Sequence, residues 1–362
     1  TSQLTEVMNR LGCYPVRNFR TSFFEDIEPI SASIMKSKYW VRNSTCYRCP
    51  IACGKVCEAK DGPYAGVVAR PEYESTWALG AHCGVSDFSA ILSAIRLCDE
   101  YGLDTMTAGY MVGFVMDLSA EGLIKPADLD GVSLRFGDAE ALVRLVEMIG
   151  RREGFGRELG EGILPLLEKH PTWSEFAVHV KGSPFAGYDP RAFHGIGLTY
   201  GTSNRGACHN VGGWTISDEL LSGRYDRFAL AGKGELVKRL QDVRAYVDSS
   251  GVCTNARRAL GLTDKPREVV LKAVTGLDLT PKLLEIGERI YNLERLCLNR
   301  EGVTRRDDLL PERMSVPIPS GPAAGHKLGA AEYELMLGEY YAARAWDADG
   351  RPTPQKLQEL KL

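Results

Sequence analysis

The chain has 362 residues, of which 44% are apolar and 25% are charged, and its net charge is -3. The composition is close to the globular average, and its charge balance argues against a basic surface that would neutralise nucleic-acid phosphates. The longest apolar runs, such as 110–116, are far shorter than the roughly 20 residues needed to cross a bilayer. We therefore expect no nucleic-acid partner and no membrane partner.

The first residues lack the basic and apolar regions of a signal peptide, and they do not begin with methionine. We therefore expect either a processed chain or a piece of a longer protein. The ten cysteines are more typical of metal or redox sites than of a disulfide framework, because the chain is long and shows no secretion signal. Scattered cysteines among apolar neighbours, such as Cys13, Cys98 and Cys297, are most simply buried thiols.

Most of the predicted elements are helices. Residues 1–45 indicate only short helices, and 64–70 could form a short strand. Ser86 or Asp87 can cap a helix of apolar spacing that ends at Gly102, and Asp104 or Thr105 can cap a second helix that runs to about residue 120. Further helices are predicted at 138–152, 155–169, 217–247 with a break near 232, 280–300, 330–346 and from 354 onward.

A long segment at 179–215 is rich in Gly, Pro, Asn and His and has no periodicity. Such irregular segments inside a compact protein are usually functional. A break at 171–173 suggests a domain boundary near residue 178. The predicted fold is mainly α, with few short strands and two helical domains packed against each other. The first domain would be 1–178 and the second 179–362.

Three cysteines lie close together in the sequence as CxxCxxxC, at Cys46, Cys49 and Cys53. Soft thiolates on a tight loop select zinc, copper(I) or an iron–sulfur cluster. A structural zinc and a cubane cluster each need four ligands, so one would come from elsewhere. Buried thiols and a zinc site remain alternatives, but no second CxxC is present, so we favour a cluster with one remote ligand. The spacing is the reverse of the CxxxCxxC of radical enzymes.

Two helix ends have matching sequences, Asp-Glu-Tyr-Gly-Leu-Asp at 99–104 and Asp-Ser-Ser-Gly-Val-Cys at 248–253. Glycine in this place suits a left-handed helix C-terminus. Either segment alone could be an ordinary helix end, but the match between them favours a shared role. Cys253 in the second segment is the natural fourth thiolate.

Taken together, these motifs resemble the tungsten-containing aldehyde ferredoxin oxidoreductase family. The resemblance runs from about residue 46 to the C-terminus and is specific as a set, although no single motif would be. The other motifs that carry it are Arg-Pro-Glu-Tyr-Glu at 70–74, Tyr-Asp-Pro-Arg at 188–191, Asn-Arg-Gly-Ala-Cys-His at 204–209, Asn-Leu-Glu-Arg at 292–295 and Arg-Glu-Gly at 300–302.

The resemblance implies two cofactors, a [4Fe–4S] cluster and a tungsten (or molybdenum) bis-pterin beside it. The implied cluster ligands are Cys46, Cys49, Cys53 and Cys253. The implied pterin contacts are Asp99, Asp104, Asp248 and Cys253. Val252 replaces the leucine that is usual in the family.

The resemblance also implies a catalytic pair, Glu74 and His209. A carboxylate can take a proton from the water that attacks a carbonyl, and a protonated imidazole can donate to a developing alkoxide. A solvated or capping glutamate and a hydrogen-bonded core histidine are the alternatives. Glu72 is a weaker candidate. Arg191 and Arg205 would either bind cofactor phosphates or form structural ion pairs.

Family members carry an additional, mostly β, N-terminal pterin-binding domain, for which this sequence has no matching segment. We therefore expect the C-terminal two domains of a longer enzyme, which on their own could be inactive. Some members bridge two subunits through iron bound by Glu-x-x-His. The corresponding stretch 93–96 reads Ser-Ala-Ile-Arg, so that iron site should be absent, and a homodimer stays an open question.

The function implied by the resemblance is oxidation of an aldehyde to a carboxylate with electron transfer to ferredoxin. The cofactor would supply the oxygen-atom and electron chemistry. Oxygen-sensitive chemistry with reduced cysteines indicates the cytoplasm of an anaerobe. The alternatives are a low-potential reductase of the same family, or a non-catalytic electron-transfer or metal-binding module.

Overall fold

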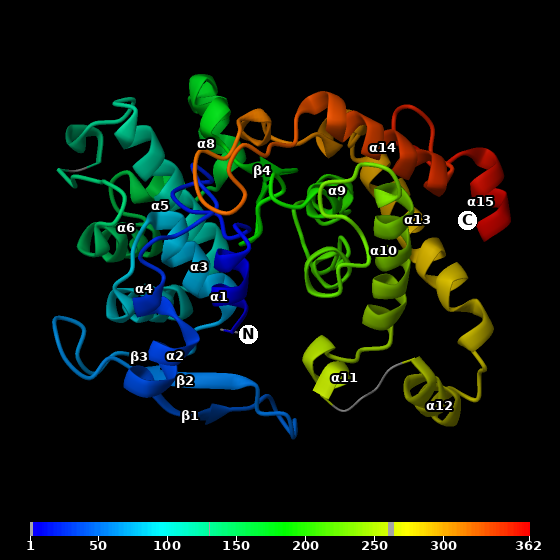
Figure 1. Ribbon diagram of the computed structural model, residues 1–362, viewed down its shortest axis with the longest axis horizontal. Coiled ribbons are helices and arrows are strands. Elements are labelled where there is room, and N and C mark those ends of the chain that lie inside the picture. The colour runs from blue at the N-terminus through cyan, green and yellow to red at the C-terminus, as the bar shows by residue number, and fades with distance from the viewer. Residues whose placement is uncertain (1–2, 130, 260–263) are drawn as a thin grey trace. The chain divides into compact units, whose positions relative to one another are not determined.

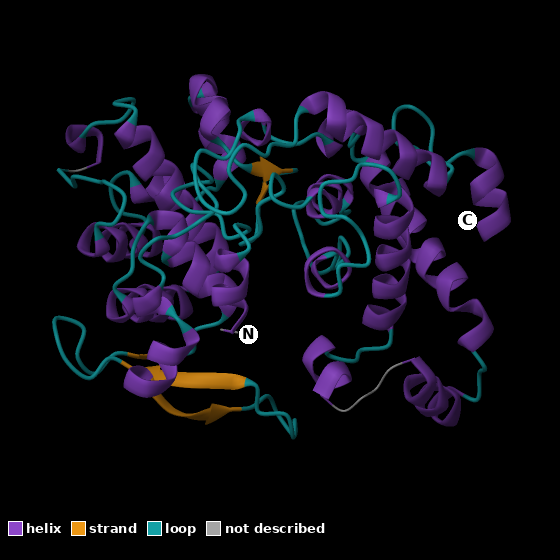
Figure 2. Ribbon diagram, viewed as in Figure 1, coloured by secondary structure: helices purple, strands orange, loops and turns teal. Residues whose placement is uncertain are grey.

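The computed structural model describes residues 3–129, 131–259 and 264–362, which form two compact units. Unit 1 comprises Thr1–Ser44, Gly54–Ala192 and Pro311–Gly329. Unit 2 comprises Thr45–Cys53, Phe193–Leu310 and Ala330–Leu362. Helices dominate both units and strands are few, as Figure 2 shows, which confirms the mainly α prediction.

The division between the units differs from the predicted boundary near residue 178. From Gly54 the chain stays in unit 1 as far as Ala192. The break predicted at 171–173 is a surface 3₁₀ turn, and the chain beyond it returns to the core of unit 1. There the Tyr73 hydroxyl donates to the Gly187 carbonyl at 2.8 Å. The units are also not continuous in sequence, because 45–53 belongs to unit 2 and 311–329 belongs to unit 1.

Unit 1 is built mainly around α3, α4, α5 and α6 (Figure 1). In it, α3 packs on α5, and α4 packs on α6. Its helices and strands are α1 (Gln3–Arg10), η1 (Glu28–Ile30), α2 (Ala32–Ile34), η2 (Met35–Tyr39), β1 (Trp40–Ser44), β2 (Gly54–Glu58), β3 (Val68–Ala69), α3 (Tyr73–Leu79), η3 (Ala81–Cys83), α4 (Phe88–Tyr101), α5 (Thr105–Ala120), η4 (Pro126–Leu129), α6 (Ala139–Arg151), α7 (Gly156–Leu159), α8 (Ile163–Lys169), η5 (Pro171–Phe176), β4 (His179–Val180), β5 (Ser183–Pro184) and η9 (Glu312–Ser315).

The predicted caps of α4 and α5 are present. The Asp87 carboxylate accepts from the backbone N–H of Ser89 at 2.9 Å, and Asp104 accepts from that of Thr107 at 2.7 Å. Each bond satisfies an amide that the first helical turn leaves without a partner. Gly102 ends α4 at φ 68°, in the left-handed region. No single described helix is long and apolar enough to cross a membrane, although the bent pair Tyr73–Cys83 and Phe88–Tyr101 would qualify by length and composition alone.

A three-stranded antiparallel sheet in unit 1 has the order β1-β2-β3. The β1–β2 ladder runs from Trp40 opposite Cys57 to Ser44 opposite Gly54. The cysteine-bearing loop Thr45–Cys53 therefore connects the two strands of a hairpin. A second, two-stranded sheet pairs β4 with β5.

Unit 2 is organised around α10, against which α9, α13 and α14 pack (Figure 1). The helix α9 lies inside the segment 179–215, which the sequence predicted to be irregular. The elements of unit 2 are α9 (His194–Thr202), η6 (Ser217–Leu221), α10 (Lys233–Ser249), α11 (Thr254–Ala259), α12 (Asp264–Thr275), η7 (Thr280–Lys282), α13 (Leu283–Arg300), η8 (Arg305–Asp308), α14 (Ala330–Arg344) and α15 (Pro354–Leu360).

The core of unit 2 contains a buried polar network that joins α10 to α14. The Arg344 guanidinium donates to the Asp242 carboxylate at 2.5 Å and to the Gln241 amide oxygen at 2.8 Å. The Tyr340 hydroxyl lies 2.6 Å from that same oxygen. Buried charges are tolerated only when they are paired and hydrogen-bonded, so this network fixes how the two helices meet.

Candidate functional site

The three clustered cysteines lie on the hairpin loop Thr45–Cys53. Cys46 and Cys53 are exposed and Cys49 is half-buried, and none of the three is in a disulfide bond with another described residue. Two non-glycine residues of this loop, Arg48 at φ 54° and Ala52 at φ 49°, adopt the left-handed region. The Thr45 hydroxyl closes the loop by donating to the Cys49 carbonyl at 2.5 Å. The result is a tight loop that carries three thiols, each at least partly exposed, and partly exposed thiols are the ones that react and bind metals most readily.

The segment that contains Cys253 reaches this loop within unit 2. The side-chain amide of Asn255 lies 3.7 Å from the Cys53 sulfur, and Cys253 itself is an exposed, free thiol. Two segments some two hundred positions apart in sequence therefore touch. Among the described residues, no group of three His, Cys, Asp or Glu side chains is close enough to hold a metal ion. The donor set has the chemistry that a [4Fe–4S] cluster needs, and ligation by Cys46, Cys49, Cys53 and Cys253 stays a prediction.

Arg244 on α10 holds the second matching segment in place. Its Nε donates to the Asp248 carboxylate at 2.8 Å, and its Nη1 donates to the hydroxyl of Thr254, which directly follows Cys253. Gly251 between them is at φ 70°. The Arg244 guanidinium thus connects Asp248, the first residue of the motif, with Thr254, the residue that follows Cys253.

The first matching segment, in unit 1, also has a glycine in the left-handed region. Its last residue, Asp104, has a role that the last residue of the second segment, Cys253, does not have. Asp99 is exposed in the last turn of α4, where the helix dipole disfavours a negative charge. Asp104 caps α5, as described above. The backbone similarity between the segments is confirmed, and the predicted pterin contacts of Asp99, Asp104, Asp248 and Cys253 stay predictions.

Glu74 is held in the first turn of α3 in unit 1. The Gly187 N–H donates to Glu74 Oε2 at 2.9 Å. Burial raises the pKa of Glu74 to about 7, although hydrogen bonds from Gly187 and Tyr188 act in the opposite direction. A carboxyl group with this pKa can exchange a proton at neutral pH, which is what a general base needs. Glu72, the weaker candidate, is exposed at the N-cap of α3.

His209 is buried in unit 2, with its ring 5.5 Å from that of Trp214. The Asn210 amide donates to His209 Nε2 at 3.0 Å, so a neutral ring carries its hydrogen on Nδ1. Burial lowers the pKa of His209 to about 3, and the nearby guanidinium groups of Arg244 and Arg205 lower it further. The predicted role as a protonated donor does not fit this pKa, because the imidazole is neutral at pH 7. A neutral ring can still donate its one N–H.

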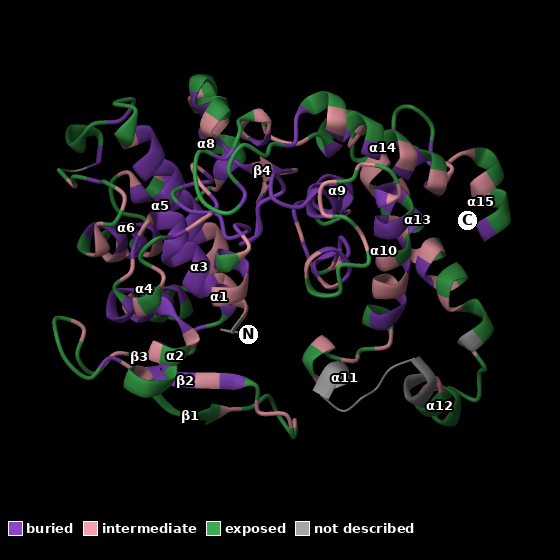
Figure 3. Ribbon diagram, viewed as in Figure 1, coloured by how far each residue is buried: buried purple, intermediate pink, exposed green. Residues whose placement is uncertain are grey.

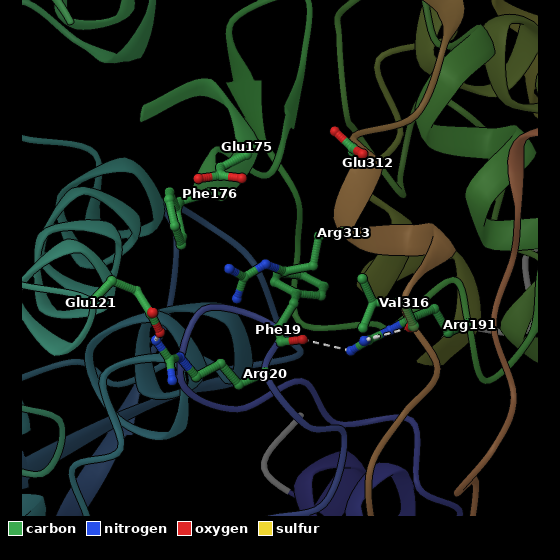
Figure 4. Close-up of a pocket in the computed structure, with 9 residues that line it drawn as sticks. All are labelled: Phe19, Arg20, Glu121, Glu175, Phe176, Arg191, Glu312, Arg313 and Val316. Carbon is green, nitrogen blue, oxygen red and sulfur yellow. Dashed lines mark hydrogen bonds and ion pairs between the residues drawn. The ribbon is translucent and has the colours of Figure 1, made fainter. Parts of the chain in front are cut away.

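Arg191 forms a structural ion pair, one of the two roles predicted for it. It lies at a pocket of about 410 Å³ in unit 1 (Figure 4). Its guanidinium makes two bonds to buried Asp189, at 2.7 and 3.0 Å, and donates to the Phe19 carbonyl at 2.6 Å. The pocket is lined by three arginines and three glutamates, so it carries no excess positive charge for a phosphate.

The remaining cysteine near the loop in sequence, Cys57, faces the core of unit 1. It is fully buried, and burial raises the pKa of its thiol to about 11. A thiol this hard to ionise is a poor metal ligand. Cys98 is similar, with a pKa raised by burial to about 12. Cys13 is also buried as predicted, whereas the prediction for Cys297 is wrong, because that residue is exposed.

Three residues near the predicted site were missed by sequence reasoning. Asn255 touches Cys53, Arg244 bridges Asp248 and Thr254, and Asn210 orients His209. Asn255 and Asn210 stand within two positions of a predicted residue, and proximity in sequence could have drawn attention to them. Arg244 precedes Asp248 by one helical turn, a spacing that lets the two pair on a helix surface.

The whole chain, residues 1–362, matches the family model described as aldehyde ferredoxin oxidoreductase, domains 2 & 3. It is 40% identical to the tungsten-containing aldehyde ferredoxin oxidoreductase of Pyrococcus furiosus, over 100% of this chain and 59% of that protein. It is 39% identical to the protein of the same name from Thermococcus kodakarensis, again over 100% and 59%. The chain thus spans about 60% of the length of these relatives.

More distant similarities extend the comparison. The chain is 30% identical to the aliphatic sulfonate oxidoreductase, WOR-like subunit, of Pyrococcus furiosus, over 96% of this chain and 55% of that protein. The solved active site complex BamBC of benzoyl coenzyme A reductase shares the fold, with a TM-score of 0.74 at 17% identity, over 99% of this chain and 59% of that one. On the full-length family match and the 40% identity, the chain belongs to the aldehyde ferredoxin oxidoreductase family and comprises its domains 2 and 3.

Proposed function

We propose that this protein is the cluster- and cofactor-binding part of an enzyme that oxidises an aldehyde to a carboxylate and reduces ferredoxin. The single observation that carries the proposal is the 3.7 Å contact between Asn255 and the Cys53 sulfur within unit 2. It brings the Cys253 segment to the cysteine loop. The named activity of the 40% identical relatives supports the choice of reaction.

The residues proposed to hold the cofactors are those that the sequence motifs implied. In unit 2, Cys46, Cys49, Cys53 and Cys253 would hold a [4Fe–4S] cluster. Asp99 and Asp104 in unit 1, and Asp248 with Cys253 in unit 2, would contact the pterins. A tungsten bis-pterin, when bound, would supply the oxygen-atom and electron chemistry of the reaction.

The reaction consumes an aldehyde and a water and yields a carboxylate, three protons and two electrons. Glu74 would take a proton from the water, because its pKa near 7 leaves much of it ionised at neutral pH. Neutral His209 would donate its Nδ1 hydrogen to the oxygen on which negative charge develops. A [4Fe–4S] cluster held by the four cysteines would supply one-electron transfer to ferredoxin, in the cytoplasm of an anaerobe.

The test is an assay of the complete enzyme, purified without oxygen. We expect aldehyde-dependent reduction of ferredoxin, with stoichiometric formation of the carboxylate and two ferredoxins reduced per aldehyde. Failure of a panel of aliphatic and aromatic aldehydes to reduce either ferredoxin or a viologen dye would contradict the proposal. Zinc in place of iron and sulfide would indicate a non-catalytic metal-binding module instead.

A second candidate is a different oxidoreductase of the same family, including a low-potential reductase. The 30% identity to a sulfonate oxidoreductase subunit favours it, and the fold shared with a benzoyl coenzyme A reductase complex is compatible with it. The assay separates the two candidates, because this alternative predicts turnover of a sulfonate, or oxidation of a reduced viologen by an aromatic thioester, without aldehyde oxidation.

A further inference from the structure

The strand β1 and the turn before it form an exposed, cationic surface in unit 1. Figure 3 shows β1 largely in green, because four of its five residues are exposed. It is the edge strand of its sheet, with β2 on one side. The sequence 29–57 that surrounds it has five basic residues and no acidic one. We call the exposed residues of this surface the β1 face: Lys36, Lys38, Trp40, Val41 and Arg42.

The β1 face has the composition of a docking surface. Trp40 is 37% exposed and Val41 is 51% exposed, so an aromatic and an aliphatic side chain meet the solvent together. Lys36, Lys38 and Arg42 are exposed on the same segment of chain, and within the described residues no acidic side chain forms an ion pair with any of the three. Exposed apolar side chains close in sequence to three unpaired cations fit an acidic partner surface.

Covalent connection keeps the β1 face close to the cysteine loop. The β1–β2 ladder ends with Ser44 opposite Gly54, and the loop joins these two residues. Each residue extends the chain by at most about 3.6 Å, so the Cα of Cys53 lies within about 4 Å of that of Gly54. By the same rule, the Cα of Cys46 lies within about 7 Å of that of Ser44.

We propose that the β1 face is the docking surface for a small acidic electron-transfer protein of the ferredoxin class. The inference rests on the proposed function, which needs such a carrier to take electrons from the cluster. Positive charge on the enzyme would steer the negatively charged carrier to the edge of the hairpin whose loop carries the cluster ligands. Trp40 and Val41 would then form the apolar contact once the carrier has docked.

A second explanation for the cations is that they protect an edge strand from pairing with other chains. Lysine on an edge strand commonly prevents the strand from pairing with other chains. The two explanations differ in their dependence on sign. A negative charge prevents strand pairing as well as a positive charge does. An acidic carrier, in contrast, is attracted by positive charge and repelled by negative charge.

The experiment reverses the three charges in the complete enzyme, as Lys36→Glu, Lys38→Glu and Arg42→Glu together. We expect the KM for an acidic ferredoxin at low salt to rise about tenfold or more, because steering contributes factors of about 10–10³ to association. We expect the rate of aldehyde oxidation with benzyl viologen to stay unchanged. We also expect salt to raise the KM for ferredoxin in the parent enzyme but not in the variant.

The matched control changes the charge by the same amount elsewhere on unit 1, as Lys125→Glu, Arg135→Glu and Arg144→Glu, all at exposed positions. This control should leave the KM for ferredoxin within about twofold of the parent value. An unchanged KM in the β1-face variant, or an equal rise in both variants, would overturn the proposal.

Cross-linking of the unaltered complete enzyme gives a second readout that does not depend on a variant. A carbodiimide joins lysine amines to carboxylates that lie in contact with them. We expect Lys36 or Lys38 in the peptides linked to ferredoxin, and links confined to other lysines would overturn the proposal. If no aldehyde is oxidised with any acceptor, the proposed function fails, while the cross-linking result still decides where an acidic carrier binds.

Discussion

At the scale of single residues, the structure separates groups that can react at neutral pH from groups that only support the fold. Glu74 has a pKa raised to about 7, whereas Arg191 is fully engaged with Asp189 and backbone carbonyls. Both residues lie in motifs that resemble those of the family, and the motifs alone could not separate their roles, because burial and pairing depend on the folded chain. His209 shows the same limit, since its neutral state follows from its burial.

Replacing Glu74 by Gln in the complete enzyme tests its role as a base. Loss of a general base lowers kcat by about 10²–10⁴, while the iron content should not change. A base must be ionised, so kcat/KM of the parent enzyme should fall about tenfold per pH unit below pH 7 and level off above it. In the variant, kcat/KM should not show this fall below pH 7. Full activity of the variant, or the same fall of its kcat/KM below pH 7, would exclude Glu74 as the base.

His82 gives a residue-scale prediction about stability. It is fully buried beside Phe19, Trp77 and Tyr110, and burial lowers its pKa from 6.5 to about 3. Below pH 6.5 the unfolded chain binds a proton that the folded chain does not bind until about pH 3. The stability that a neutral His82 contributes is therefore present above pH 6.5 and is lost as the pH falls towards 3.

The variant His82→Leu should remove this dependence, whatever its effect on stability at neutral pH. Between pH 4 and 6, the slope of unfolding free energy against pH should fall by about 1.4 kcal/mol per unit, the value for one proton. Denaturant unfolding at several pH values measures the slope. An identical slope in parent and variant would mean that His82 binds a proton in the folded protein as readily as in the unfolded chain.

At the scale of elements, the helices that begin with a side-chain cap could be predicted, whereas an uncapped, fully buried helix and an exposed strand could not. The helices capped by Asp87 and Asp104 begin and end as predicted. The helix α9 was missed because all of its residues are buried, so it has no polar face to create a period. The strand β1 was missed for the opposite reason, because its exposed residues do not alternate.

The predicted helix 155–169 is a further difference. It forms two short helices, α7 and α8, separated by 160–162. Gly162 at φ 89° lies in a conformation that no α-helix contains. Glycine at this place breaks the hydrogen-bond ladder, although the apolar spacing continues through it.

The contact between α3 and α5 yields an element-scale prediction. A Cβ on Gly109 would lie 2.5 Å from the carbonyl carbon and oxygen of Ala78, so the two helices can meet only because Gly109 lacks one. The variant Gly109→Ala should lower the free energy of unfolding by about 1–3 kcal/mol, as overpacking does. Because α3 also carries Glu74, aldehyde turnover should fall with it.

The helical residue Gly338 is a matched control, since a Cβ there meets no atom within 4 Å. The variant Gly338→Ala should raise the free energy of unfolding by about 0.5–1 kcal/mol, because alanine favours a helix more than glycine does. Urea unfolding of both variants measures the two changes. Two changes of the same sign would contradict the account of the α3–α5 contact.

At the scale of the whole molecule, the fold is assembled from segments that are far apart in sequence. The loop Thr45–Cys53 belongs to unit 2, although the chain on both sides of it belongs to unit 1. The segment Pro311–Gly329 belongs to unit 1, although the chain on both sides of it belongs to unit 2. Composition and periodicity report on neighbours in sequence, so they could not predict this division. The contact between Asn255 and Cys53 agrees with the prediction that the Cys253 segment lies near the cysteine loop, and ligation by Cys253 stays a prediction.

The central claim is that one sulfur from the second unit's α10–α11 connection completes the cluster on the hairpin loop. The most direct measurement is the iron and acid-labile sulfide content of anaerobically purified protein, together with the electron paramagnetic resonance spectrum of its reduced form. We predict about four irons and four sulfides per chain for the parent. The exposed thiol of Cys297 supplies the control. Cys297→Ser should keep these values and the cubane spectrum, whereas Cys253→Ser should lose the cluster or convert it to one with fewer irons. Unchanged iron, sulfide and spectrum in Cys253→Ser would contradict the claim.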